Sequence, residues 1–243
     1  MKIKKSFNQE KLKKVQVFNG AQLKYLAFFS MLVDHVNNAL VVPFLQGKGF
    51  LLYLSNLFSI LGRIAFPLFV FFVVEGFFKT GSRKKYFINL FVFAVLSEVP
   101  FDMFTSRVYF NPNWNNVLFT LALCLASLWI IDCLKEKLRN KIFWYLASLL
   151  VVISFSFFAM GLSLDYDYHG ILLAYLFYLF YDRPLLGVGL GYLSLIKEVY
   201  SFLGFGLILT YNGQRGKQNK IINYLFYPVH LLILGILRFS LSI

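Results

Sequence analysis

Long apolar runs separated by short polar segments dominate the pattern along the chain. Roughly 20 apolar residues are enough to cross the hydrocarbon core of a bilayer. Six runs approach that length, at 24–45, 60–78, 86–104, 116–134, 142–162 and 221–241. Three shorter apolar segments lie at 169–181, 185–196 and 199–211, and the last two are rich in glycine. We predict about nine transmembrane spans, or a helical hairpin that only partly crosses in place of 185–211. Residues 50–59 are expected at the membrane interface.

The runs are continuous and lack the alternation of outer-membrane strands. Helices also satisfy their own backbone hydrogen bonds inside a membrane. Composition agrees, because 59% of the residues are hydrophobic and 14% are charged, against about 25% charged in soluble domains. We therefore predict an all-α polytopic membrane helix bundle, with one transmembrane domain over 21–243 and a basic segment over 1–20.

The net charge of +13 would suit nucleic acid, but most basic residues flank apolar runs. Basic loops at 79–85, 135–141 and 215–220 share a side with the N-terminus if that terminus is cytoplasmic. We expect a multi-pass protein of the bacterial inner membrane, in contact with lipid and not with nucleic acid. Residues 1–20 form either an interfacial helix, with Phe7, Leu12, Val15 and Phe18 in the lipid, or a disordered tail.

Asp34 and His35 lie in the middle of the first apolar run. A carboxylate at that depth costs about 2.5–3.5 kcal/mol, so such residues usually have a function. Histidine titrates near neutral pH and is the best candidate for a general base. Asp34 lies one turn from Asn38 and could orient an imidazole or hold an amine. The alternative is a buried polar pair that packs helices.

Other polar residues within the runs have two interpretations each. His230 follows Pro228 near mid-span and either acts on a ligand or bonds to a neighbouring helix. Arg63 could hold an anionic group, but we favour its pairing with Glu98 or Asp102. These two acids lie four residues apart and could alternatively share a proton.

Residues near the ends of the runs are expected to have simpler roles. Glu75 with Lys79 has the favourable i,i+4 order of an ion pair, and Glu75 either has a functional role or belongs to a snorkelling surface pair. Asn116 is a helix cap or a cavity donor, and the acidic segment 165–169 is expected to be a solvated loop. The cations Arg83, Lys84 and Lys85 either attract a phosphate-rich cofactor or only set the topology. The two cysteines form no metal-binding pattern, and we expect no metal.

Several ordered motifs resemble the TraX family over about residues 21–235. The first span carries Leu23-Lys24-Tyr25-Leu26-Ala27, Met31 and Asp34-His35. Further matches are Gly62-Arg63-Ile64-Ala65-Phe66-Pro67-Leu68-Phe69, Val74-Glu75-Gly76-Phe77, Ser97-Glu98-Val99-Pro100-Phe101-Asp102, Asn116-Val117, Phe119-Thr120-Leu121, Tyr211-Asn212-Gly213 and Tyr227-Pro228-Val229-His230-Leu231.

The resemblance implies a membrane-embedded acyltransferase, because named members of the family N-acetylate a pilin subunit. Acetyl-CoA or another acyl-CoA would be the co-substrate, and a peptide, glycan or lipid would be the acceptor. His35 would act as base and Asp34 would orient it. Asn38, Asn116 or His230 would stabilise the oxyanion. Further substrate-site candidates are Arg63, Glu75, Glu98, Asp102 and Tyr227. The phosphates of coenzyme A would lie near Arg83, Lys84 and Lys85.

Two hypotheses from other classes use the same residues. A proton-coupled transporter or flippase would use the buried acids and histidines as a proton path. A scaffold of a secretion or conjugation apparatus would use them to hold helices together. Dependence on acyl-CoA separates the enzyme from both.

Overall fold

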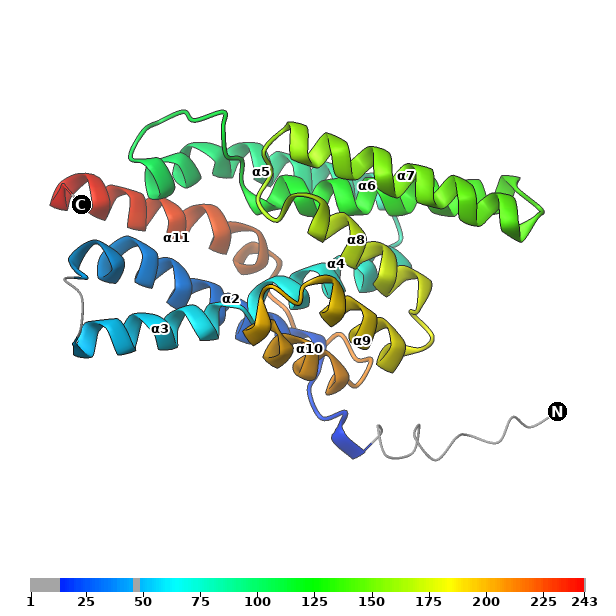
Figure 1. Cartoon of the computed structure of the whole chain (residues 1–243), viewed down its shortest axis with the longest axis horizontal. Helices are drawn as coiled ribbons and strands as arrows, with labels where there is room; N and C mark the ends of the chain where they lie inside the picture. Colours follow the sequence, from blue (N-terminus) through cyan, green and yellow to red (C-terminus); the bar gives the residue numbers. More distant parts are fainter. Residues whose placement is uncertain (1–13, 46–48, 243) are drawn as a thin grey trace.

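A computed structural model describes residues 14–45 and 49–242. These residues form helices and loops without a β-strand, which confirms the predicted all-α class (Figure 1). The helices are α2 (Gly20–Val36), η1 (Asn37–Val41), η2 (Val42–Phe44), α3 (Phe50–Gly62), α4 (Ala65–Lys79), α5 (Arg83–Ser106), α6 (Val117–Lys137), α7 (Lys141–Gly161), α8 (Asp167–Leu179), α9 (Pro184–Ser194), η3 (Val199–Ser201), α10 (Phe202–Leu209) and α11 (Lys220–Leu241).

Six helical segments of the described chain are long and apolar enough to cross a membrane, and they make this an integral membrane protein. One of the six consists of α3 and α4 together, over Phe50–Lys79. The predicted number of nine spans is therefore too high for full-length crossings. Helices α8, α9 and α10 have 13, 11 and 8 residues, and such helices are about 12–20 Å long, against about 30 Å of hydrocarbon.

The second long segment is broken between α3 and α4, at Arg63 and Ile64. Pro67 lies in the first turn of α4, where its missing N–H removes no helical hydrogen bond. The Ser30 hydroxyl donates to the carbonyls of Leu61 and Gly62, which end α3. Helix α3 lies along α2 and nearly in line with α4 (Figure 1). The expected interfacial segment at 50–59 is thus part of this long segment instead.

Helices α9 and α10 pack against each other as a hairpin (Figure 1). The hairpin starts and ends near Tyr181 and Tyr211, which both bond to Glu75 near the end of α4. Its tip carries Glu198, which reaches Arg63 at the break before α4. The Gly-rich segments therefore form the partial hairpin that we considered beside two full spans.

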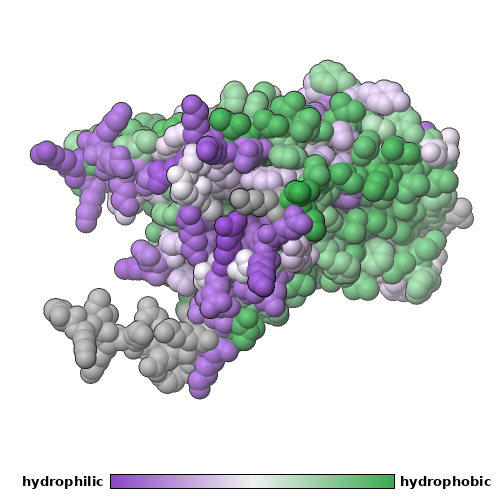
Figure 2. All heavy atoms as spheres, turned by 180° about the vertical axis from the view of Figure 1, so that it is seen from behind, coloured by the Kyte–Doolittle hydropathy of each residue, from purple (hydrophilic) through white to green (hydrophobic). Residues whose placement is uncertain are grey.

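Polar loops gather at one end of the bundle. Figure 2 shows hydrophilic side chains toward the end that includes the α6–α7 loop and an apolar surface over much of the rest. Phe18 forms backbone hydrogen bonds with Thr210 and Asn212, so it contacts protein and is not inserted in lipid as an interfacial helix would place it. Val15 is exposed, which leaves its expected contact with lipid a prediction, and Phe7 and Leu12 lie outside the described residues.

Candidate functional site

A cavity of about 410 Å³ lies around the break between α3 and α4. Its wall combines aromatic side chains with several ionisable ones. Ligand pockets likewise combine apolar walls with a few polar groups that orient the ligand. The ionisable and amide side chains in the wall are Asp34, His35, Asn38, Arg63, Asp165, Asp167, His169, Lys197 and Glu198. Tyr227 lines it too.

The backbone of α2 changes its winding directly after the Asp34–His35 pair. Residues Asn37–Val41 form a π-helical turn, a feature often found at functional sites. The fully buried Asn37 side chain donates to the Ser55 carbonyl at 3.2 Å and to the Ser59 hydroxyl at 3.0 Å. Both acceptors belong to α3, so this turn is fastened to the neighbouring helix.

The Asp34 carboxylate is only partly satisfied. Its Oδ2 accepts a hydrogen bond from the Asn38 amide at 3.1 Å, as the one-turn spacing predicted. Its Oδ1 is buried and has no partner among the described residues. Gly62 makes this position possible, because a Cβ at Gly62 would overlap the carboxylate.

His35 and His230 form a hydrogen-bonded pair. The Nδ1 of His35 lies 2.8 Å from the Nε2 of His230, and the two rings are nearly parallel, with 8° between their planes. The Nδ1 of His230 lies 2.6 Å from the Phe226 carbonyl, one turn back on α11. Both interpretations of His230 therefore meet here, since it bonds to a neighbouring helix and that partner is His35.

Arg63 does not pair with Glu98 or Asp102, and the interpretation that we favoured from the sequence is wrong. Its Nη1 lies 3.2 Å from Glu198 at the hairpin tip. The break between α3 and α4 turns Arg63 toward that tip, and Gly204 allows the close packing because a Cβ there would lie 2.6 Å from the Ile64 carbonyl.

Glu98 and Asp102 have other partners. The Asn116 side chain donates to Glu98 and to the Ala94 carbonyl, and it also caps α6. Asp102 accepts from the Asn111 backbone N–H at 2.7 Å. Glu98, Asp102 and Asn116 do not line the cavity. They fasten the loop between α5 and α6, so the cap interpretation of Asn116 is confirmed.

The segment 165–169 is not a solvated loop, because it forms part of the cavity wall. Ser163, Tyr166 and Asp167 have positive φ angles of 49°, 61° and 32°, which side-chain-bearing residues rarely adopt. Tyr166 stacks on Phe66. Burial raises the pKa of Asp165 to about 6, although a hydrogen bond from Trp114 opposes the rise.

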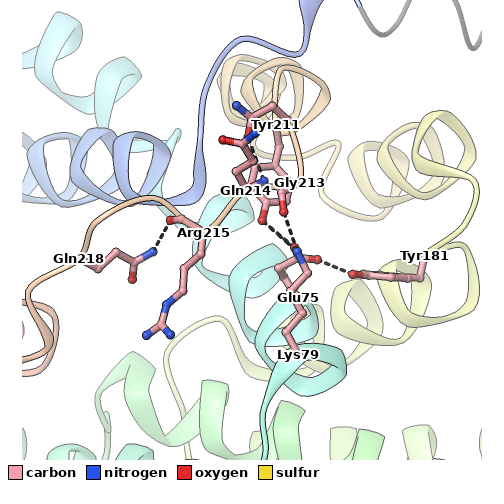
Figure 3. A network of polar contacts seen from close by, with 9 residues as sticks. Glu75, Lys79, Tyr181, Tyr211, Gly213, Gln214, Arg215 and Gln218 are labelled. Atoms are coloured by element: carbon pink, nitrogen blue, oxygen red, sulfur yellow. Dashed lines mark hydrogen bonds and ion pairs between the residues drawn. The ribbon is translucent and has the colours of Figure 1, made fainter.

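Glu75 belongs to a separate polar group near the end of α4 (Figure 3). It pairs with Lys79 at 2.5 Å, as the spacing predicted. It also accepts from the hydroxyls of Tyr181 at 2.6 Å and Tyr211 at 2.7 Å. Only 7% of Glu75 is exposed, which argues against the surface-pair interpretation, and its functional role stays a prediction.

Arg83, Lys84 and Lys85 lie beyond this group, at the start of α5. Arg83 pairs with Asp132 at 2.8 Å and lies 4.0 Å above the Phe77 ring. Lys84 and Lys85 are exposed. The 15 residues of α4 separate them from the cavity, a distance of about 22 Å.

The structure thus unites Asp34, His35, Asn38, Arg63 and Tyr227 at one cavity, with His230 directly behind His35. Sequence reasoning missed the contributors from the later part of the chain. These are Asp165, Tyr166, Asp167, His169, Lys197 and Glu198. One signal was available: charged residues flank apolar segments that are too short to cross a bilayer alone.

Comparisons with known proteins agree with the motifs. Residues 19–238 match the family model described as TraX protein. The chain is 27% identical over 253 residues to a protein of Dichelobacter nodosus named probable fimbrial assembly protein FimC, serogroup H1. The match covers 89% of this chain and 94% of that relative. No solved structure matches the chain. Since the family model spans nearly all of it, this chain belongs to the TraX family.

Proposed function

We propose that this protein is an integral membrane acyltransferase that transfers an acetyl group from acetyl-CoA to an amine. The observation that carries the proposal is the His35–His230 pair beside Asp34 at the wall of a polar cavity. General bases in acyl transfer are commonly imidazoles that a second group holds in one tautomer.

The hydrogen bonds define the tautomers of the neutral pair. A carbonyl only accepts, so Nδ1 of His230 carries the hydrogen that bonds to Phe226. Nε2 of His230 then has a lone pair and accepts from Nδ1–H of His35. The Nε2 of His35 is left with a lone pair and has no partner among the described residues. This nitrogen is the base.

The acetyl transfer then proceeds in a few steps that account for every bond and proton. The acceptor amine attacks the carbonyl carbon of the thioester, and Nε2 of His35 takes a proton from the amine nitrogen. The carbon–nitrogen bond forms, the carbon–sulfur bond breaks, and the thiolate of coenzyme A leaves. The imidazolium of His35 returns its proton to that thiolate.

Charged groups in the cavity fit the other requirements of this reaction. The unpartnered Oδ1 of Asp34 can accept a hydrogen bond from an N–H of the neutral acceptor amine and so orient its lone pair toward the thioester. Arg63 and Asn38 line the same cavity, and the Arg63 guanidinium and the second N–H of the Asn38 amide, whose other N–H bonds to Asp34, can stabilise the oxyanion. Asn116 and His230 are less suited to that role, because their donor groups already have partners.

The name of one relative supports a choice of acceptor. The relative from Dichelobacter nodosus is named for fimbrial assembly, so we propose a peptide amine of the pilin-subunit type as the acceptor. The reaction would then take place in the bacterial inner membrane.

An acetyl-transfer assay tests the proposal. It uses the purified protein in lipid, labelled acetyl-CoA, and peptides with free or blocked N-termini. We expect label on the free amine only, and His35→Ala to lower the rate by about 10²–10⁴-fold. His169→Ala is the matched control, since it removes an imidazole from the same cavity but leaves the pair intact, and its effect should be far smaller. Wild-type transfer by His35→Ala would refute the mechanism.

One observation favours proton-coupled transport as a second candidate. The broken segment α3–α4 meets the tip of a partial hairpin, and discontinuous helices of this kind form the binding sites of many transporters. Proton uptake into vesicles without acetyl-CoA, abolished by Glu198→Gln, would support this function over acyl transfer.

A further inference from the structure

We propose that Lys24 and Arg215 bind the phosphate groups of the acyl donor at the polar end of the bundle. This inference rests on the proposed function. The ligand class is a nucleotide whose phosphates carry a long arm that ends in a thioester. The site differs from the Arg83–Lys85 segment, which we named from the sequence as the candidate for these phosphates.

The reacting cavity cannot hold the whole donor. Its volume of about 410 Å³ is near the lower end of the range for small-ligand pockets, about 300–1,000 Å³. It must also admit the acceptor amine. The nucleotide of the donor therefore lies outside this cavity, and its phosphates need cations within reach of an extended arm.

Lys24 is a half-buried cation without its own carboxylate. Its Nζ bonds to the neutral Gln218 amide oxygen at 3.3 Å and lies 5.2 Å from the centre of the Phe72 ring. No described carboxylate forms an ion pair with Lys24, and Glu75 at this end of the bundle already accepts from Lys79, Tyr181 and Tyr211. Lysine is seldom buried without an anionic partner, and a ligand phosphate would supply one.

Arg215 adds a second cation beside Lys24. The Gln218 side chain accepts from Lys24 Nζ and donates to the Arg215 carbonyl, which brings the two cationic residues close together, so an anion between their charges would be favourable. No hydrogen bond or ion pair reaches the Arg215 guanidinium from the described residues, and Figure 3 shows it extending away from the Glu75 group.

The loop that carries Arg215 has a defined shape. Its Gln214 carbonyl accepts from the Gly20 N–H at 2.8 Å, at the start of α2. Gly213 and Gly216 have φ angles of 80° and 70°, which favour glycine. A Cβ at Gly216 would overlap Asn19, the capping residue of α2. The backbone beside Arg215 is therefore held against the helix that carries Lys24.

Helix α2 connects this end with the reacting cavity. His35 lies eleven residues after Lys24 on the same helical segment, which corresponds to about 16 Å. The thioester arm of coenzyme A has a chain comparable to about five extended residues, or roughly 17 Å. Phosphates at Lys24 thus allow the thioester to reach the base at His35.

The Arg83–Lys85 segment fits this role less well. Arg83 is neutralised by Asp132 and covered by its contact with Phe77. Lys84 and Lys85 are exposed, as Arg215 also is. They lie about 22 Å from the cavity along α4, however, whereas Lys24 lies about 16 Å from His35 along α2. This segment is therefore the competing hypothesis in the test.

The test measures coenzyme A binding by calorimetry to the full-length protein in zwitterionic nanodiscs. Lys24→Gln and Arg215→Gln should each weaken binding about tenfold. The double variant Lys84→Gln/Lys85→Gln and the control Lys137→Gln should bind as the wild type does. Unchanged binding in the first two variants, or a loss confined to the Lys84/Lys85 variant, would overturn the proposal.

Two further measurements show whether a negative result contradicts the phosphate site alone or the proposed function as well. Binding to anionic-lipid vesicles should change little in Lys24→Gln, and a loss there with unchanged coenzyme A binding would assign the site to lipid headgroups instead. Acetyl transfer at saturating acetyl-CoA should survive in Lys24→Gln with a raised KM, whereas His35→Ala loses kcat. A wild-type protein that neither binds coenzyme A nor transfers acetyl would overturn the proposed function, and this site with it.

Discussion

At the scale of single residues, His230 is a positioning residue for His35. We expect His230→Leu to lower kcat by about tenfold or more, because Nδ1 of His35 loses its acceptor and the ring is no longer held in one tautomer. His230→Gln should retain most of the rate, since its amide oxygen can accept the same hydrogen bond. A role in packing alone would not distinguish the two variants in this way. The measurement is kcat and KM of each variant, beside their melting temperatures.

Ionisation of Asp165 should make the free energy of unfolding depend on pH. Its pKa of about 6 lies above the ordinary 3.8 because of burial. The folded state therefore holds a proton between about pH 4 and pH 6 that the unfolded state releases, and stability falls as pH rises through this window. Asp165→Asn cannot ionise and should be more stable than the wild type above pH 6, by roughly 1–3 kcal/mol. The gain should vanish near pH 4. Unfolding in detergent at several pH values checks this, and a gain independent of pH would contradict it.

At the scale of elements, the fit of the α9–α10 hairpin against the helix break depends on Gly204. A Cβ there would lie 2.6 Å from the Ile64 carbonyl oxygen, which is backbone and cannot turn aside. Gly204→Ala should push α10 away, separate Arg63 from Glu198, and cost about 1–3 kcal/mol. Gly206→Ala on the same helix meets nothing within 4 Å and is the matched control. Thermal unfolding of both variants tests this, and equal effects would refute the close fit.

The sequence predicted the elements that a local pattern determines. Apolar runs located the long helices, and four-residue spacing predicted the Asp34–Asn38 and Glu75–Lys79 contacts. Pro67 indicates a bend near Arg63, but the full break was not predictable because apolar residues continue on both sides of it. The choice of Glu198 as the partner of Arg63 depends on a contact between residues 135 positions apart, which no local pattern contains.

The candidate site was predictable only in its first-span half. Asp34 and His35 stand out because ionisable residues are costly in an apolar run. Asp165 and Glu198 lie in polar segments, where charges are ordinary, and they become noticeable only when the short helices α8, α9 and α10 bring these segments to the cavity. The pairing of His35 with His230 likewise required α11 to be placed beside α2.

At the scale of the whole molecule, the partial hairpin predicts three classes of accessibility. With Cys124 and Cys133 replaced by serine, single cysteines at Lys137, Asn113 and Lys197 sample the polar end, the opposite end and the hairpin tip. A membrane-impermeant maleimide added to intact cells should label the cysteine at Asn113 rapidly and the one at Lys137 only after lysis, because basic loops stay inside. The cysteine at position 197 should react at least tenfold more slowly than the one at Asn113, because the tip of a hairpin that only partly crosses lies at membrane depth, where an aqueous maleimide has less access. Two full spans in place of α9 and α10 would instead expose position 197 outside and give equal rates. Labelling at Lys137 before lysis would show that the bundle has the opposite orientation, and the donor site would then face away from the cytoplasmic supply of acyl-CoA.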